Sequence, residues 1–195
     1  NLAARYLYED RWGGQMNWNK GFRGTDEVYG ESIFTNRVEL MGNYQLPTTE
    51  KISLAFSLNH HHQNSMYGNT LYMGKQQVGF AQMVWDKTIG KHDFLLGSAL
   101  RYTYYNDNTP ATGSIDPSKF GTQPQRIVLP GIFAQNEITF NEKHKLLLGL
   151  RYDYNTAHGN IFTPRVAYKY TINNHQFLRL NMGTGFRVVN IFTED

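Results

Sequence analysis

Three consecutive histidines, His60, His61 and His62, are the residues of this chain whose type points most directly to chemistry. Neutral imidazoles bind transition metals and haem iron. Adjacent side chains of a β-strand point to opposite faces, so at most two of the three, His60 and His62, could contact one ion or ligand. Polar residues follow at once, and a solvated position where a strand enters a loop is the simpler interpretation.

A second group of candidates lies between residues 12 and 29, where aromatic side chains are mixed with a few charged ones. The residues expected to contact a ligand there are Trp12, Trp18, Arg23, Asp26, Glu27 and Tyr29. Aromatic surfaces with a few polar anchors suit a rigid, largely planar ligand. Asp26 and Glu27 could also hold Ca²⁺, but two carboxylates do not supply the oxygen ligands that this ion requires. A loop whose aromatic residues pack on one another is an equally good interpretation.

Signatures of catalysis are missing or broken, so we expect no enzyme and no cofactor. The sequence has no G-x-S-x-G, H-E-x-x-H or P-loop motif, and Gly183-Thr184-Gly185 lacks the third glycine of a dinucleotide-binding turn. Ser57 and His60 would point to opposite faces of a strand. Because the chain has no cysteine, disulfides, thiolate catalysis and cysteine-based zinc sites are excluded.

Composition favours a β protein. The 195 residues include 13 Tyr, 12 Phe and 18 Gly, which is typical of strands and turns. Mean hydropathy is −0.54, and no stretch is apolar over the length of a membrane helix. The net charge of +3 comes from scattered Lys and Arg, so it indicates no nucleic-acid partner. The chain begins with Asn1 and shows no signal peptide, which we interpret as a processed chain or a piece of a longer one.

Period-two alternation of large apolar and small or polar residues is the strongest pattern. Leu146, Leu148 and Leu150, for example, alternate with Gly149 and Arg151. The pattern predicts nine strands, near 2–10, 33–46, 51–62, 76–87, 92–105, 129–140, 145–155, 163–172 and 176–186.

The links between these segments alternate in length. Tight polar turns are predicted at 47–50, 88–91, 141–144 and 173–175, and longer loops at 11–32, 63–75, 106–128 and 156–162. An up-and-down sheet with this alternation has all its short turns at one end, as outer-membrane barrels do. Proline-containing loop 106–128 is interpreted as a flexible extracellular lid. Aromatic residues near the strand ends, Phe177 among them, would mark the lipid–water interfaces.

In such a barrel the apolar flank of each strand faces lipid and the polar flank faces a lumen. The residues expected on the lumen side are Arg151, Asp153, Arg165 and Lys169, where they could form a ladder of charge pairs across neighbouring strands. Glycine and alanine on the same flank would leave room inside. Two alternatives stay open. One is a small closed outer-membrane barrel with an even number of strands and a structural or adhesive role instead of transport. The other is a soluble carbohydrate-binding β-sandwich in which Phe56, Leu100 and Leu148 pack against a second sheet.

Four short motifs carry a resemblance to a known family. They are Ile132–Glu137 (similar to FxQ(D/N)E), Leu148–Asp153 (GLRYD), Thr163–Tyr168 (sPRvaly) and Leu180–Arg187 (yGxGFR). In this order and spacing they resemble the β-barrel of TonB-dependent outer-membrane receptors over about a third of the chain. Residues 5–46 resemble Bacteroidetes members of the iron-chelate and cobalamin receptor branch. Val188-Val189 departs from the family, which has Ala-Pro there.

The resemblance implies an all-β, antiparallel, up-and-down transmembrane β-barrel segment. Nine strands would be the middle part of a barrel of about 22 strands, so we expect residues 1–195 to form one partial barrel domain without the plug domain or the terminal strands. The implied function is TonB-driven uptake of a ferric siderophore, cobalamin or haem across the outer membrane of a Gram-negative cell. Expected partners are the receptor's own plug domain, TonB acting through that plug, the lipid bilayer, the ligand, and a surface lipoprotein over the loops.

Overall fold

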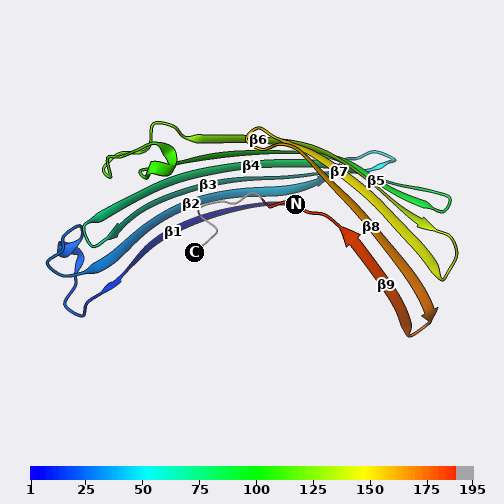
Figure 1. Ribbon diagram of the computed structural model, residues 1–195, viewed down its shortest axis with the longest axis horizontal. Helices are drawn as coiled ribbons and strands as arrows, with labels where there is room; N and C mark the ends of the chain where they lie inside the picture. Colours follow the sequence, from blue (N-terminus) through cyan, green and yellow to red (C-terminus); the bar gives the residue numbers. More distant parts are fainter. Residues whose placement is uncertain (188–195) are drawn as a thin grey trace. The chain divides into compact units, whose positions relative to one another are not determined.

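A computed structural model describes residues 1–187 and shows one antiparallel nine-stranded sheet (Figure 1). The strands are β1 (Leu2–Gly14), β2 (Gly30–Gln45), β3 (Lys51–Tyr67), β4 (Thr70–Ile89), β5 (His92–Asp107), β6 (Gln125–Thr139), β7 (His144–Asn155), β8 (Gly159–Asn173) and β9 (Gln176–Gly183). Two short 3-10 helices, η1 (Lys20–Phe22) and η2 (Pro110–Thr112), lie in the links. No helix in this part of the chain has the length and hydropathy needed to cross a bilayer.

Each strand pairs with its neighbours in sequence, in the order β1 to β9. The β1–β2 register runs without interruption from Leu2↔Gly42 to Gly14↔Gly30. This confirms the predicted up-and-down topology and the number of strands within residues 1–187. The motif position Val188-Val189 lies outside the described residues.

The two alternative folds do not fit this sheet. All described strands belong to one sheet, and the side chains of Leu100 and Leu148, which a sandwich would bury, are 50% and 43% exposed. Strands β1 and β9 are the edges of the sheet and are not paired with each other. The described residues therefore form neither a sandwich nor a small closed barrel.

Two of the four predicted long loops are wrong. Strand β3 continues to Tyr67 and β4 begins at Thr70, so the link predicted at 63–75 is a turn at Gly68 and Asn69. The link predicted at 156–162 is also short, because β8 already begins at Gly159. In both places the continuing strands, such as Leu71-Tyr72-Met73 and Ile161-Phe162, do not alternate between large apolar and small or polar residues. The remaining long links are residues 15–29 and 108–124.

The residues gather into two compact units, which we describe separately. Unit 1 comprises Asn1–Tyr44, Ala55–Ala81 and Arg101–Val128, and unit 2 comprises Gln45–Leu54, Gln82–Leu100 and the residues from Leu129 on. Unit 1 contains both long links. Unit 2 contains strands β7, β8 and β9 and most of the tight turns.

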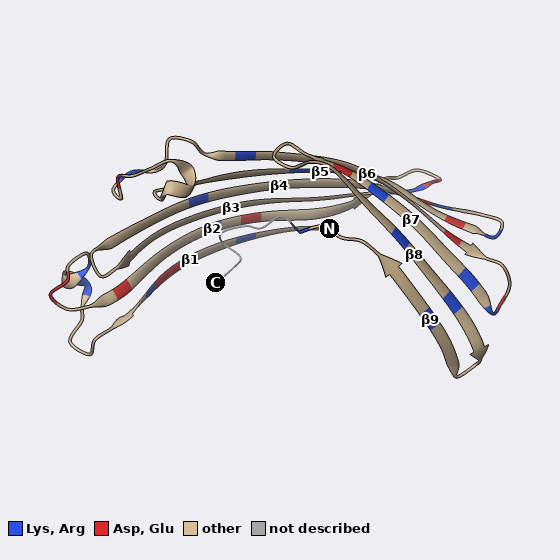
Figure 2. Cartoon of the chain, in the orientation of Figure 1, with Lys and Arg blue, Asp and Glu red and all other residues tan. Residues whose placement is uncertain are grey.

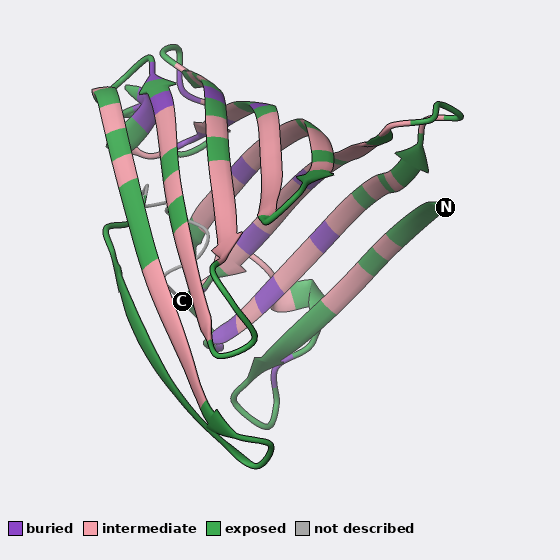
Figure 3. Cartoon of the chain, turned by 90° about the vertical axis from the view of Figure 1, so that its right-hand side faces the viewer, coloured by how far each residue is buried: buried purple, intermediate pink, exposed green. Residues whose placement is uncertain are grey.

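One flank of the strands in unit 2 is apolar and uncovered. The register brings Ile132, Tyr152 and Phe162 side by side across β6, β7 and β8. The same flank carries Leu148, Leu150, Val166, Leu180 and Met182, all of them exposed. Exposed and half-buried positions recur along the strands, and buried positions are few (Figure 3). Apolar side chains thus face outward from the sheet, as a lipid-facing flank requires.

Candidate functional site

The polar flank of unit 2 is centred on an ion pair within β7. Arg151 donates two hydrogen bonds to Asp153, from Nε to Oδ2 and from Nη2 to Oδ1, each 2.7 Å long. Asp153 is fully buried, with an exposed fraction of 0%. Gly131 lies directly opposite Asp153 on β6. A Cβ atom on residue 131 would lie 3.0 Å from Cγ of Asp153 and still closer to Oδ1. Only glycine at this position therefore leaves enough space for the carboxylate.

A second glycine makes room for an aromatic ring. A Cβ atom on Gly97 of β5 would lie 2.6 Å from Cε2 of Phe133. The Arg151 guanidinium also lies over this ring, 5.6 Å from its centroid. Side chains of the protein itself therefore fill the space that small residues were expected to leave at Gly97 and Gly131. At Gly149 the nearest atoms to a Cβ would be 3.8 Å away, so that position stays open.

A shallow depression surrounds Gly149. Its lining comes from five neighbouring strands, β4 to β8, and includes Gln82, Leu95, Phe133, Gln135, Gly149, Arg151, Thr163 and Arg165. Arg165 is paired in register with Gly149 and is exposed. The depression therefore offers the exposed guanidinium of Arg165 beside amide, hydroxyl and aromatic side chains.

The four residues predicted on the lumen side share one flank of the sheet, because Arg165 is opposite Gly149 and Lys169 is opposite Lys145. They do not form the predicted ladder across strands. Arg151 pairs with Asp153 two residues along its own strand, and no ion pair joins Arg165 or Lys169 to a carboxylate of residues 1–187. Figure 2 shows the charged residues along the strands and turns.

In unit 1 the link 15–29 folds back onto the sheet through Trp18. The indole is buried and covers Gly30, whose Cβ atom, if present, would lie 2.5 Å from Cγ of Trp18. The Trp12 ring packs beside it in a tilted arrangement, with ring centroids 5.5 Å apart and an interplanar angle of 30°, and Trp12 is itself 58% exposed. The link lies on the flank that carries Tyr6 and Tyr8, since Trp12 shares that flank of β1.

Arg23 fixes the same link to two strands. Its Nε donates to Oγ of Ser32 at 2.6 Å and its Nη2 donates to Oδ1 of Asn64 at 2.8 Å. The guanidinium also lies over the ring of Phe34, 4.8 Å from its centroid. These contacts hold Arg23 against the sheet, so it positions the link.

The remaining candidates of this link are nearer to solvent. Asp26 accepts a hydrogen bond from Nδ2 of Asn69, and Glu27 is exposed. Tyr29 donates to Oε1 of Glu31 at 2.8 Å, and this hydrogen bond raises the pKa of the Tyr29 hydroxyl. Trp18 and Arg23 thus point toward the sheet and anchor the link, whereas Asp26, Glu27 and Tyr29 lie nearer to solvent.

The histidines lie inside β3 and not at its entry into a loop, because that strand continues to Tyr67. His61 is buried and its Nδ1 accepts from Nε of Arg37 at 3.3 Å. His60 is 3.3 Å from Nε2 of Gln77, and the His62 ring lies 6.1 Å from that of Phe120. Within residues 1–187 no three His, Cys, Asp or Glu residues are arranged to hold a metal ion.

Asp107 organises the link 108–124 and was not singled out from the sequence. Its carboxylate, 1% exposed, accepts hydrogen bonds from the Tyr105 hydroxyl at 2.6 Å and from Oγ1 of Thr112 at 2.7 Å. The backbone N–H of Thr109 also donates to it at 3.0 Å. The predicted flexible lid therefore has a defined hydrogen-bonded fold. The sequence Asp-Asn-Thr-Pro at residues 107–110 could have indicated this fold, because Asx turns form in such sequences.

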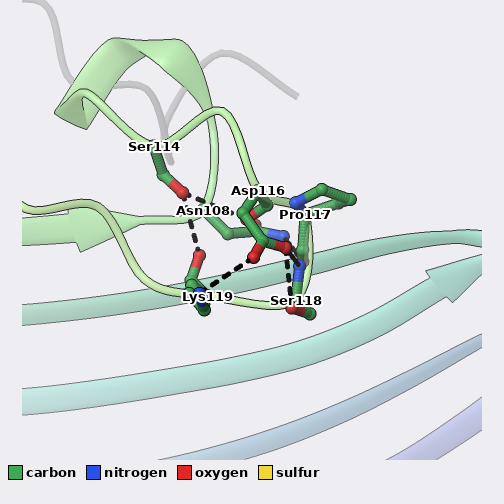
Figure 4. Close-up of polar contacts among 6 residues, drawn as sticks. All are labelled: Asn108, Ser114, Asp116, Pro117, Ser118 and Lys119. Carbon is green, nitrogen blue, oxygen red and sulfur yellow. Dashed lines mark hydrogen bonds and ion pairs between the residues drawn. The ribbon is translucent and has the colours of Figure 1, made fainter.

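Further along the same link a second polar cluster closes a turn (Figure 4). Asp116 accepts from the backbone N–H and the hydroxyl of Ser118 at 3.0 and 2.7 Å, and pairs with Lys119 at 3.2 Å. These hydrogen bonds, the one from the Ser118 hydroxyl first, hold the pKa of Asp116 below its ordinary value. Asn108 ties the turn to the sheet by donating to the carbonyls of Leu71, at 2.8 Å, and Pro117.

Comparisons with known proteins agree with this fold. No curated protein matches the chain. Among solved structures, the sheet is similar to the crystal structure of the siderophore receptor PirA from Pseudomonas aeruginosa, with a TM-score of 0.61 and 9% sequence identity. The match covers 84% of this chain and 31% of that receptor, so the chain spans about a third of the receptor's length. The family described as TonB dependent receptor-like, beta-barrel matches residues 1–193. The chain therefore belongs to the family of TonB-dependent receptor β-barrels.

Proposed function

We propose that this chain forms part of the wall of an outer-membrane receptor that takes up a scarce nutrient into a Gram-negative cell. The observation that carries the proposal is the two-sided character of strands β6 to β9. Their apolar side chains are exposed on one flank, and the ion pair, the glycines and the free cations lie on the other. In a family of barrels the first flank suits acyl chains and the second suits a lumen.

The unpaired edges support a partial barrel. Free backbone N–H and C=O groups along β1 and β9 cannot remain unsatisfied in hydrocarbon. Further strands of the same receptor would pair with both edges, and residues 1–195 would be one portion of that single barrel domain. The receptor's plug domain would fill the lumen and contact Arg151, Asp153, Arg165 and Lys169. TonB would then act on the plug from the periplasm, using the proton gradient.

Extracellular links 15–29 and 108–124 are our proposed capture surfaces for the ligand. Trp12, Asp26, Glu27 and Tyr29 would contact it, together with His60 and His62, whereas Trp18 and Arg23 hold the link in position. A ferric siderophore is the first choice, cobalamin the second and haem the third, in line with the iron-chelate and cobalamin branch of the family. A surface lipoprotein would cover the links. The barrel would bind and admit its ligand without breaking bonds, so no catalytic residue is proposed.

The test is nutrient uptake by cells that lack the full-length gene. Uptake of a labelled ferric siderophore, of cobalamin and of haem would be measured in the deletion strain, in the complemented strain and in a strain without TonB. We expect uptake of one of the three nutrients to be lost both in the deletion strain and in the strain without TonB. Uptake should be restored when the deletion strain is complemented. Normal uptake of all three by the deletion strain would contradict the proposed ligands, and uptake that persists without TonB would contradict the mechanism.

A further inference from the structure

The apolar flank of unit 1 ends at a row of residues that crosses β3 to β6. Leu58 of β3, Tyr102 of β5 and Val128 of β6 are exposed in this row. Gly79 of β4 lies beside Leu58, because a Cβ atom on Gly79 would be 3.5 Å from Cδ2 of Leu58. In a barrel wall this row would be the last to contact acyl chains before the long links.

On β4 the same flank turns polar and then basic. Alternate residues of a strand share a flank, so Gln77 and then Lys75 follow Gly79 toward the turn at Gly68 and Asn69. Lys75 is half-buried, so part of its side chain lies along the sheet. Its ammonium group is thus carried beyond the apolar row, on the flank that would meet lipid.

On β6 a second cation lies next to the apolar row. Arg126 is exposed and lies two residues before Val128, so the two side chains share a flank. The guanidinium carbon of Arg126 is 5.9 Å from the centroid of the Tyr104 ring, which attracts the cation without cancelling its charge. A comparable ring in unit 2, Phe177, lies beside Lys169 on the polar flank, so its predicted place in an interfacial aromatic girdle is wrong. Arg126 is therefore oriented at the boundary of the apolar flank and keeps its charge.

No carboxylate compensates these two cations. Among the strand residues of unit 1 the one acid on the apolar flank is Asp10, and Nζ of Lys20 already pairs with it at 2.6 Å. No ion pair within residues 1–187 joins Lys75 or Arg126 to a carboxylate, since the acids of unit 1 that form ion pairs do so with other cations. The flank therefore carries uncompensated positive charge just beyond its apolar row.

The two cations are close enough to act together. Strand β5 lies between β4 and β6, so the strands that carry the cations are about 10 Å apart. The backbone N–H of Asn108 donates to the carbonyl of Met73 at 3.2 Å. This register puts Gln77 opposite Tyr104 and Lys75 two residues nearer to the links, an offset of about 7 Å. The backbone separation is then about 12 Å, which two long side chains can span around one phosphate group or two.

We propose that Lys75 and Arg126 bind phosphate groups on the headgroups of outer-leaflet lipids. The inference rests on the proposed function, because it takes the apolar flank to face acyl chains and the long links to be extracellular. Long basic side chains keep their stems on apolar surface and their charge at headgroup depth. Charge complementarity then selects the ligand, since an anionic membrane surface attracts Lys and Arg that lie close to it.

Lipid binding by the purified full-length receptor in detergent tests this. Fluorescently labelled diphosphoryl lipid A would be titrated, and the same lipid without its phosphates would be the matched ligand. We expect the phosphates to tighten binding to the unaltered receptor. Lys75→Gln and Arg126→Gln should each weaken binding of the diphosphoryl lipid about fivefold, and the double variant about 25-fold. None of these variants should change binding of the dephosphorylated lipid.

Two controls separate this site from a general effect of charge. Arg101→Gln removes an exposed cation of β5 from the opposite flank of unit 1 and should leave lipid binding unchanged. The conservative pair Lys75→Arg with Arg126→Lys should bind the diphosphoryl lipid as the unaltered receptor does. Equal binding of the two lipids, or equal weakening by Arg101→Gln, would overturn the proposal.

Inorganic phosphate distinguishes a lipid site from a site for free phosphate. It should not displace the lipid at equal concentration, and displacement would show that the acyl chains play no part and overturn the lipid assignment. Nutrient uptake by cells is measured separately. If uptake fails while binding still depends on the phosphates, the proposed function is wrong, whereas loss of that dependence with uptake intact removes only the lipid site.

Discussion

Replacing Gly131 with alanine tests whether the buried ion pair depends on a missing side chain. An alanine Cβ would lie 3.0 Å from Cγ of Asp153 and 3.2 Å from Nη2 of Arg151. Asp153 cannot easily move away, because it is fully buried and Arg151 holds both of its carboxylate oxygens. We therefore expect the substitution to displace the carboxylate and break the hydrogen bond from Nη2 of Arg151 to Oδ1 of Asp153.

The expected cost follows from two contributions. Overpacking of this kind costs about 1–3 kcal/mol, and losing the charge-assisted hydrogen bond to Oδ1 costs about 1.5–3 kcal/mol. Alanine also restricts the unfolded chain, which offsets about 0.4–1 kcal/mol. Gly131→Ala should then lower the free energy of unfolding by about 2–5 kcal/mol.

The assay is urea unfolding of the purified full-length receptor in detergent, followed by tryptophan fluorescence. Gly149→Ala is the matched control, because it changes a glycine of the same flank where the nearest atoms are 3.8 Å from the new Cβ. It should leave the unfolding midpoint unchanged or raise it. In an Asp153→Ala background the cost of Gly131→Ala should vanish, since the coupled partner is gone. An equal cost in both backgrounds, or an equal cost for Gly149→Ala, would refute the reasoning.

Three further predictions concern the links. Gly30→Ala should push Trp18 off the sheet, because a Cβ would lie 2.5 Å from the indole Cγ; limited proteolysis should then cut link 15–29 faster, and an unchanged rate would contradict the anchoring role. Asp116, whose pKa is held below 3.8 by Ser118, should stabilise its turn above that value and lose this contribution as the pH falls through the lowered pKa. Pepsin should accordingly cut link 108–124 more readily below pH 3.8 and at a higher pH in Ser118→Ala, so identical profiles would argue against it. A single cysteine at Ile115, which is 95% exposed, should react with an impermeant maleimide on intact cells, and one in the turn between β6 and β7 should not; the reverse pattern would invert the proposed orientation.

The alternation of residue types was sufficient to predict the sheet and the flank of each charged residue. Arg151, Asp153, Arg165 and Lys169 share a flank because side chains alternate strictly along a strand. Their partners were not predictable in this way. Asp153 pairs with Arg151 of its own strand because Gly131 leaves room opposite it. Predicting this pairing requires the register of β6 against β7.

The links were harder to predict for a different physical reason. Beyond the hydrocarbon layer a strand no longer needs an apolar flank, so the ends of β3 and β4 lose the pattern by which strands are recognised. The aromatic and charged residues of link 15–29 did indicate a structured segment. Their composition could not show that Trp18 and Arg23 point toward the sheet, because burial is decided by Gly30 and Ser32 of a neighbouring strand.

The length of the β3–β4 hairpin restricts how the sequence of this chain can vary. A tilted strand needs about 9–11 residues to cross the hydrocarbon core, whereas β3 has 17 residues and β4 has 20. Inserting one residue within β4 would exchange the two flanks of everything beyond it, so sequence drift there is restricted to substitutions. An insertion at Gly68 and Asn69 preserves the pairing and only lengthens the tip. Over evolution the tip can therefore gain or lose length, while the two arms can change only their side chains.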